Sequence, residues 1–168
     1  APGSWRALPR PALATDRLRM RYLAAVVQLT STPDVEASLA AAEAGAREAA
    51  GEGAKLVCLP ENTPFLGPET EKARHAEPLE GPRSRRLARL ARELGVYLAA
   101  GTVPERSPDP ERPFNTALLF GPDGELLGSY RKIHLFDVDL GPDGPQLRES
   151  RSVRPGTAPV VVRSEERR

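Results

Sequence analysis

The sequence has few of the residues on which several kinds of functional site depend. It contains one cysteine and two histidines among 168 residues, so an internal disulfide is excluded and the usual zinc ligand sets are not available. Phe, Trp and Tyr together make up 5%, too few for a surface that stacks nucleic-acid bases. No apolar run approaches the ~20 residues that span a bilayer. We therefore expect an intracellular protein with no cofactor, no metal, no membrane and no nucleic-acid partner.

Three sequence motifs are also missing. There is no G-x-S-x-G turn, no G-x-G-x-x-G after a strand pattern and no phosphate loop, which removes the usual signs of a serine hydrolase, a dinucleotide-binding protein and a nucleotide hydrolase. The charge is balanced as well, with a formal net value of +1. A balanced chain has no overall field to attract a polyanion.

Residues 1–21 differ from the remainder in composition. They hold five arginines and one acid, Asp16, and three prolines interrupt them. This composition resembles an organelle transit peptide, and a disordered leader is the alternative. We exclude this segment from the fold and expect a cytoplasmic protein, or a mitochondrial one if the leader directs import. Residues 22–168 are long enough for one domain.

From Tyr22 onward, strand and helix patterns alternate. Short apolar runs predict strands over 23–30, 54–60 and 96–103. Helical spacing predicts helices over 34–53 and 81–94, the first of them with Thr32 as its cap and Pro33 in its first turn. Residues 115–132 have the pattern of a hairpin that turns at 121–124. This order predicts an α/β or α+β fold in which helices cover a sheet.

Two charged residues follow predicted strands. Glu61 comes after the second strand and Pro60, and Lys132 ends the hairpin. Ligands of α/β folds bind beyond the carboxyl ends of strands. A carboxylate and an ammonium held there in a dry cleft can activate a nucleophile and stabilise an oxyanion. Solvated surface side chains are the alternative when these residues are taken alone.

Three longer blocks of the sequence resemble the motifs of a known protein family. The blocks "LVCLPEN", "EPLEGPRSRRLARLARELGVYLAAGTVPE" and "FNTALLFGPDGELLGSYRKIHLFDVD" occur in this order, and residues 22–156 resemble the amino-terminal half of the nitrilase, or carbon-nitrogen hydrolase, superfamily. The tracts "AVVQLTSTPD" and "DLGPDGPQLRESRSVRPG" resemble its deaminated glutathione amidase branch. The resemblance implies an α-β-β-α sandwich. It also implies that residues 22–168 are a partial carbon-nitrogen hydrolase domain whose carboxy-terminal half is missing.

The resemblance also implies an activity and a set of site residues. The family uses a Glu-Lys-Cys triad, in which Glu61 would be the general base and Lys132 would stabilise the oxyanion. Glu149 of "LRES" would be a supporting acid beside the lysine or the substrate. The implied reaction is hydrolysis of the terminal amide of a small peptide-like acid, deaminated glutathione, through a cysteine thioester. An ω-amidase that acts on α-ketoglutaramate is the alternative, and family members usually form homodimers.

The nucleophile is the point at which the sequence departs from the family pattern. The family's cysteine follows a turn matched here by Pro155 and Gly156, whereas this chain continues "TAPVVVRSEERR" without a cysteine. Cys58 is three residues from Glu61, so on a regular strand the two side chains point to opposite faces. We expect Cys58 to be a structural residue in the core. The chain alone is therefore predicted to be inactive, with an exposed sheet edge, and a non-catalytic fragment that pairs with an intact homologue is the alternative.

Four other residues receive secondary predictions. On an extended backbone His134 would lie on the same face as Lys132, either to support it or as a structural histidine. Asn115 opens a strand and would fix a loop through its amide. By resemblance, Phe136 and Asp137 would line the entrance to the site.

Overall fold

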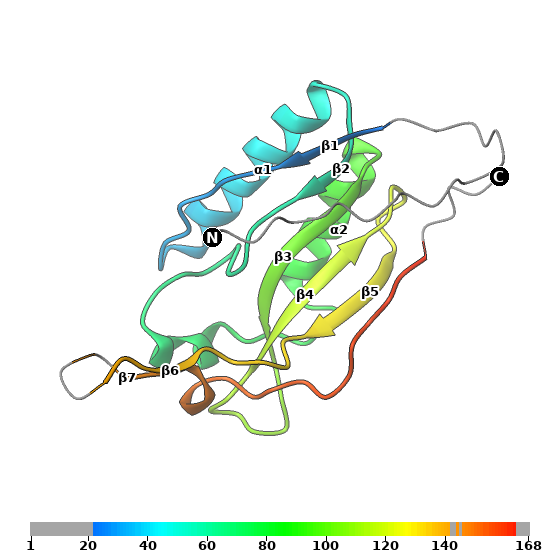
Figure 1. The fold of residues 1–168 in the computed structure, drawn as a ribbon. Helices are drawn as coiled ribbons and strands as arrows, with labels where there is room; N and C mark the ends of the chain where they lie inside the picture. Colours follow the sequence, from blue (N-terminus) through cyan, green and yellow to red (C-terminus); the bar gives the residue numbers. More distant parts are fainter. Residues whose placement is uncertain (1–21, 142–143, 145, 164–168) are drawn as a thin grey trace, which may run out of the picture.

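The main layer of the molecule is a five-stranded sheet with the strand order β1-β2-β3-β4-β5 (Figure 1). The computed structural model describes residues 22–141, 144 and 146–163, so the predicted leader over 1–21 lies outside the described residues. The strands are β1 (Leu23–Val26), β2 (Ala54–Cys58), β3 (Tyr97–Glu105), β4 (Phe114–Phe120) and β5 (Leu126–Arg131). The first three are parallel and the last two are added as antiparallel hairpins. The mixed α and β class is confirmed.

Two helices connect the parallel strands and lie on the same side of the sheet (Figure 1). They are α1 (Val35–Gly51) and α2 (Pro82–Leu94). The predicted cap of α1 is wrong by two residues, because the Asp34 carboxylate accepts a hydrogen bond from the Ala37 amide at 3.0 Å and is the N-cap. Helix α2 ends at Gly95, which adopts the left-handed conformation at φ 62°.

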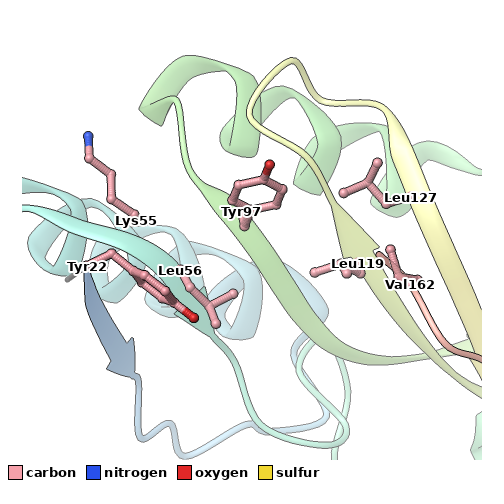
Figure 2. A pocket seen from close by; sticks show the side chains of 7 residues that line it. All are labelled: Tyr22, Lys55, Leu56, Tyr97, Leu119, Leu127 and Val162. Atoms are coloured by element: carbon pink, nitrogen blue, oxygen red, sulfur yellow. The ribbon is translucent and has the colours of Figure 1, made fainter. Parts of the chain in front are cut away.

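The apolar core lies between the helices and one face of the sheet. Its fully buried side chains come from both helices and the three central strands: Leu39, Ala42, Ala46, Val57, Leu87, Leu90, Leu98, Leu118 and Phe120. Because side chains alternate along a strand, the neighbours of these residues point to the other face. There a cavity of about 190 Å³ is lined by Leu56, Tyr97, Leu119 and Leu127, together with Tyr22 and Val162 (Figure 2).

Four short elements follow no pattern that the sequence analysis detected. They are the 3-10 helices η1 (Glu69–His75) and η2 (Glu149–Arg151) and the strands β6 (Asp137–Asp139) and β7 (Gln146–Arg148). The two strands form a small antiparallel sheet of their own. Each of these four elements contains at most one apolar residue, so none of them has an apolar run or a hydrophobic period that could identify it. They matter because they surround the polar site described next.

Candidate active site

Glu61 lies in a turn that follows β2 at the carboxyl edge of the parallel strands. Asn62 has a positive φ of 58°, and its amide donates to Thr102 Oγ1 at 2.8 Å. The hydroxyl of Thr63 donates to the Pro60 carbonyl at 2.7 Å. One of these bonds joins the turn to β3 and the other lies within the turn. Together they hold the backbone on both sides of Glu61.

Gly101 lets this turn approach β3 closely. It lies at a register shift between Ala99 and Thr102 and has φ +66°. A Cβ at this position would be 1.8 Å from the Pro60 carbonyl oxygen. Only glycine combines that backbone conformation with that approach, so the position of the Glu61 turn depends on a glycine in the neighbouring strand.

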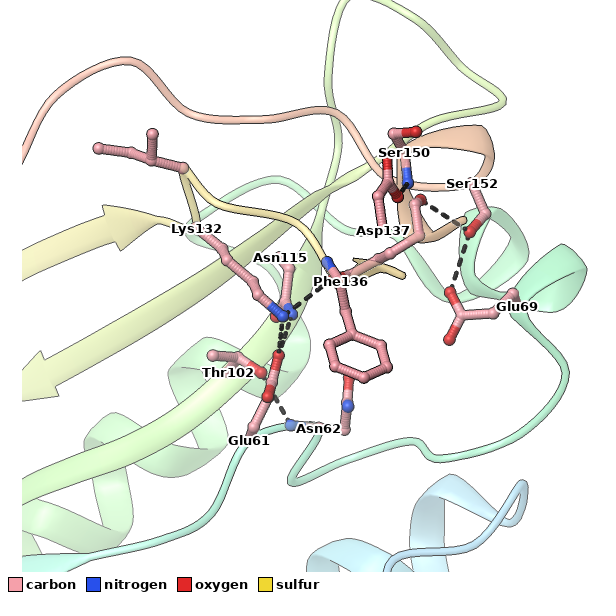
Figure 3. A network of polar contacts seen from close by, with 12 residues as sticks. Glu61, Asn62, Glu69, Thr102, Asn115, Lys132, Phe136, Asp137, Ser150 and Ser152 are labelled. Atoms are coloured by element: carbon pink, nitrogen blue, oxygen red, sulfur yellow. Dashed lines mark hydrogen bonds and ion pairs between the residues drawn. The ribbon is translucent and has the colours of Figure 1, made fainter. Parts of the chain in front are cut away.

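Two donors meet one oxygen of Glu61 (Figure 3). The ammonium of Lys132 lies 2.9 Å from Glu61 Oε1, and the side-chain amide of Asn115 donates to the same atom at 2.6 Å. Among the described residues no donor meets Oε2. Asn115 also accepts a hydrogen bond from the Lys132 amide at 2.8 Å. The predicted loop-fixing role of Asn115 therefore understates its contacts, since it touches both members of the pair.

Glu149 joins the same cluster from η2. Its Oε2 accepts from the Lys132 ammonium at 2.9 Å and from the Phe136 amide at 2.7 Å. Burial by itself would raise the pKa of Glu149, but the hydrogen bonds from Phe136 and Lys132 outweigh it and hold that pKa below its ordinary value. Glu149 is therefore a carboxylate at neutral pH.

Lys132 lies between the two carboxylates. Burial lowers the pKa of Lys132, but its hydrogen bonds to Glu61 and Glu149 together raise this pKa by more. The pKa of Lys132 is therefore above its ordinary value. The residue is an ammonium that directs two of its donors at carboxylates. The structure thus brings together the three residues that the sequence analysis selected, and their catalytic roles stay predictions.

These residues line a cavity of about 470 Å³. Its walls come from the Glu61 turn, η1, the β6–β7 hairpin and η2, and the lining residues are Glu61, Asn62, Glu69, Lys72, Lys132, Phe136, Gln146, Leu147, Arg148 and Glu149. The sequence analysis did not identify Lys72, Glu69 or Arg148. They belong to the short elements that carry no periodic signal, and their positions depend on how those elements pack.

Two secondary predictions differ from what is observed. Asp137 does not line the cavity, and instead its Oδ1 accepts a hydrogen bond from the Ser150 amide at 3.0 Å. His134 is exposed and makes no hydrogen bond within the described part of the chain. The rule that residues two apart share a face fails for His134 because β5 ends at Arg131, before Lys132.

The three side chains differ in their exposure to water. The side chain of Glu61 is 49% exposed, whereas those of Lys132 and Glu149 are 25% and 9% exposed. The helices cover the other face of the sheet, so the described residues leave Glu61 open to water. The dry cleft in which such a pair can activate a nucleophile is therefore not formed around Glu61 by the described residues alone.

Cys58 occupies the last position of β2 but not the predicted core. Its side chain is half-buried and stands outside the apolar cluster, in which the preceding residue, Val57, is fully buried. Burial raises the pKa of Cys58, so the thiolate that reacts as a nucleophile is disfavoured. No hydrogen bond joins Cys58 to Glu61 in the described residues.

The described residues hold no group of three or more His, Cys, Asp or Glu side chains arranged to bind a metal ion. Where a cation is needed between Glu61 and Glu149, the Lys132 ammonium supplies it. In the same part of the chain, no helix is both long and apolar enough to cross a membrane.

Comparison with known proteins shows the family of the chain. The family model for carbon-nitrogen hydrolases matches residues 23–166. The chain belongs to the carbon-nitrogen hydrolase family. It is 41% identical over 138 residues to an omega-amidase NIT2 of Danio rerio, covering 81% of this chain and 48% of that protein. It is 40% identical over 136 residues to a deaminated glutathione amidase of Synechocystis, covering 80% of this chain and 50% of that protein.

A solved structure gives the same relationship. Nit3 of Saccharomyces cerevisiae, a nitrilase-superfamily member, superposes with a TM-score of 0.70 at 30% identity, covering 84% of this chain and 51% of Nit3. The nitrilase-type fold is thereby confirmed for the described residues. The chain spans about half the length of these relatives.

Proposed function

We propose that this domain supplies the general base and the oxyanion-stabilising cation of an amidase, and that the amidase cleaves an amide bond of deaminated glutathione. One observation carries the proposal. The two donors to Glu61 converge on Oε1, which leaves Oε2 available to accept a proton. The family membership and the cyanobacterial relative support an amide as the substrate.

In the proposed reaction, Glu61 Oε2 takes the proton of a cysteine thiol while the sulfur attacks the amide carbon. The negative charge that develops on the amide oxygen is stabilised by the Lys132 ammonium, whose third N–H is free of the two carboxylates. Glu61 then returns the proton to the nitrogen, the C–N bond breaks and the amine leaves, which is cysteinylglycine from deaminated glutathione and ammonia from a primary amide. Water activated by Glu61 hydrolyses the thioester to a carboxylic acid and the thiol. Glu149 positions Lys132 throughout.

The proposal assigns the attacking thiol to polypeptide outside these 168 residues. Cys58 is disfavoured because burial raises its pKa and because it has no contact with Glu61 among the described residues. By resemblance the nucleophile belongs to a block beyond the turn at Pro155 and Gly156. Within that scheme residues 22–168 form part of a longer hydrolase domain, which we expect to be a homodimer in the cytoplasm, or in mitochondria if residues 1–21 direct import.

Release of the amine product tests this function, and that product is cysteinylglycine from deaminated glutathione and ammonia from a primary amide. We would assay the 168-residue chain alone, and the chain expressed together with the carboxy-terminal half of the Synechocystis relative. Turnover is expected only in the second case, and Glu61→Gln should abolish it while Cys58→Ala leaves it unchanged. Turnover by the chain alone that is lost in Cys58→Ala would contradict the assignment of the nucleophile.

A second substrate is favoured by the 41% identity to the omega-amidase. The same assay with α-ketoglutaramate separates the two, because the true substrate should have the higher kcat/KM. A non-catalytic role, in which the chain pairs with an intact homologue, predicts no turnover in either case and mixed dimers in native mass spectrometry.

A further inference from the structure

The cavity beside Glu61 contains a buried cation that the proposed reaction does not use. Lys72 lies on η1, and its side chain is only 7% exposed. Its ammonium lies 2.9 Å from Glu69 Oε1, and this is its single ion pair or hydrogen bond in the described part of the chain. A lysine rarely becomes this buried without a strong reason, because removing an ammonium from water costs free energy unless anions replace the water.

Glu69 by itself is a weak reason for that burial. Its side chain is 49% exposed, so water already solvates much of its charge. Its other oxygen, Oε2, accepts a hydrogen bond from the Ser152 hydroxyl at 2.9 Å (Figure 3). An ammonium has three N–H donors, and Glu69 accepts one of them. Lys72 therefore retains two donors in a partly desolvated wall of the cavity.

The other cations of the cavity are already engaged or more exposed. Lys132 is held between Glu61 and Glu149. Arg148 is 31% exposed and lies 3.6 Å from Asp139 Oδ2. Lys72 is the most buried of these three cations, and a buried charge interacts more strongly with an added anion than an exposed one does.

Lys72 also lies within electrostatic reach of the reacting end. Its charge contributes to the lowering of the Glu149 pKa, after the larger effects of burial, which opposes it, and of the Phe136 and Lys132 hydrogen bonds. The cavity of about 470 Å³ that joins Lys72 to Glu61 has the size of a small-molecule site. A short molecule with an amide at one end and an anion at the other can therefore contact both ends of it.

We propose that Lys72 binds a carboxylate at the far end of the substrate and so selects acids that carry a terminal amide over neutral amides. The inference rests on the proposed function in one respect, since it takes the amide to lie at Glu61 and Lys132. It adds the residue that recognises the acid.

Binding to the 168-residue chain tests this without any turnover. The probes are glutaramate, which has one amide and one carboxylate, and glutaramide, which has the same length and no charge. NMR titration gives both dissociation constants. The unmodified chain should bind glutaramate about tenfold more tightly, as for a charge-assisted hydrogen bond in a partly buried site. Lys72→Met should bring the ratio close to one and leave the glutaramide constant unchanged.

Two further variants make the result specific. Lys55→Met removes the same charge from β2, outside the cavity, and should retain the tenfold preference. Lys72→Arg keeps the cation and should retain most of it, with circular dichroism used to verify that each variant is folded. Equal binding of the two probes by the unmodified chain would overturn the proposal. So would a Lys72→Met variant that weakens both probes alike, or loss of the preference in Lys55→Met.

Failure of this proposal can be told apart from failure of the proposed function. A preference for glutaramate that disappears in Lys72→Met, without ammonia release in any assay, would support the carboxylate site and count against catalysis. Ammonia release that depends on Glu61, with equal kcat/KM for the acid and the neutral diamide, would support catalysis and refute the role of Lys72.

Discussion

Replacing Gly101 with alanine tests whether the Glu61 turn depends on the backbone of the neighbouring strand. Two costs combine at this position. An L-residue other than glycine in the left-handed conformation costs about 1–2 kcal/mol, and Gly101 has φ +66°. The new Cβ would also lie 1.8 Å from the Pro60 carbonyl oxygen and 2.4 Å from Thr63 Oγ1, where real Cβ atoms keep at least 3.0 Å. Overpacking of this kind typically costs about 1–3 kcal/mol.

The expected loss for Gly101→Ala is therefore about 2–5 kcal/mol, which is a large fraction of the ~5–15 kcal/mol that stabilises a typical domain. Urea unfolding of the 168-residue chain, followed by circular dichroism, measures it. Gly51→Ala is the matched control, because nothing lies within 4 Å of a Cβ there and the residue ends α1. That change should be neutral or stabilise by up to about 1 kcal/mol.

Equal unfolding midpoints for the two alanine variants would refute this reasoning, since both substitutions add the same methyl group and differ only in backbone conformation and neighbours. If Gly101→Ala is folded but destabilised, the NMR amide resonances of Asn62 and Thr63 in the turn should shift from their positions in the unmodified chain. Unshifted resonances of Asn62 and Thr63 in a destabilised variant would show that the strain is relieved elsewhere, and the proposed link between this glycine and the Glu61 turn would fall.

Three further predictions concern the site. Asn115→Leu removes a hydrogen bond to a carboxylate that is 49% exposed, so it should cost about 1 kcal/mol in urea unfolding, and no change would count against the bond. Because the pKa of Glu149 is below its ordinary 4.5 in the folded chain, its ionisation stabilises the fold above about pH 4.5, and this stability is lost as pH falls through the folded pKa. Glu149→Gln should therefore lower stability at pH 7 and flatten its decline below pH 4.5, whereas an unchanged slope would exclude Glu149 as the source. Since burial raises the pKa of Cys58, its thiol should react with a disulfide reagent more slowly in the folded chain than in urea, and faster reaction in the folded chain would revive Cys58 as a nucleophile.

The elements that the sequence predicted correctly share one property, which is a pattern repeated several times. Helix α2 begins at Pro82 and ends before Gly95, within one residue of the predicted range of 81–94, because its leucines recur at helical spacing. The hairpin of β4 and β5 turns at the predicted residues 121–124. Elements η1, β6, β7 and η2 were not predicted, since each contains at most one apolar residue and so has no hydrophobic pattern.

The prediction for Cys58 failed for a different reason. An apolar run such as "KLVCLP" does not show which of its residues face the helices, because both faces of a central strand can be apolar. The register with β3 puts Val57 on the helix side and leaves Cys58 half-buried on the opposite face. The same uncertainty of face affected His134, whose backbone had already left the strand.

The sequence by itself determined the family, the order of the main elements and the identities of Glu61, Lys132 and Glu149, because these depend on local patterns and on motif order along the chain. Only the tertiary structure decided how the three meet. Both donors to Glu61 reach the same oxygen, and a buried lysine from an unpredicted 3-10 helix joins them in one cavity. Distances between segments far apart in the chain follow from how the elements pack, and no short pattern of residues encodes them.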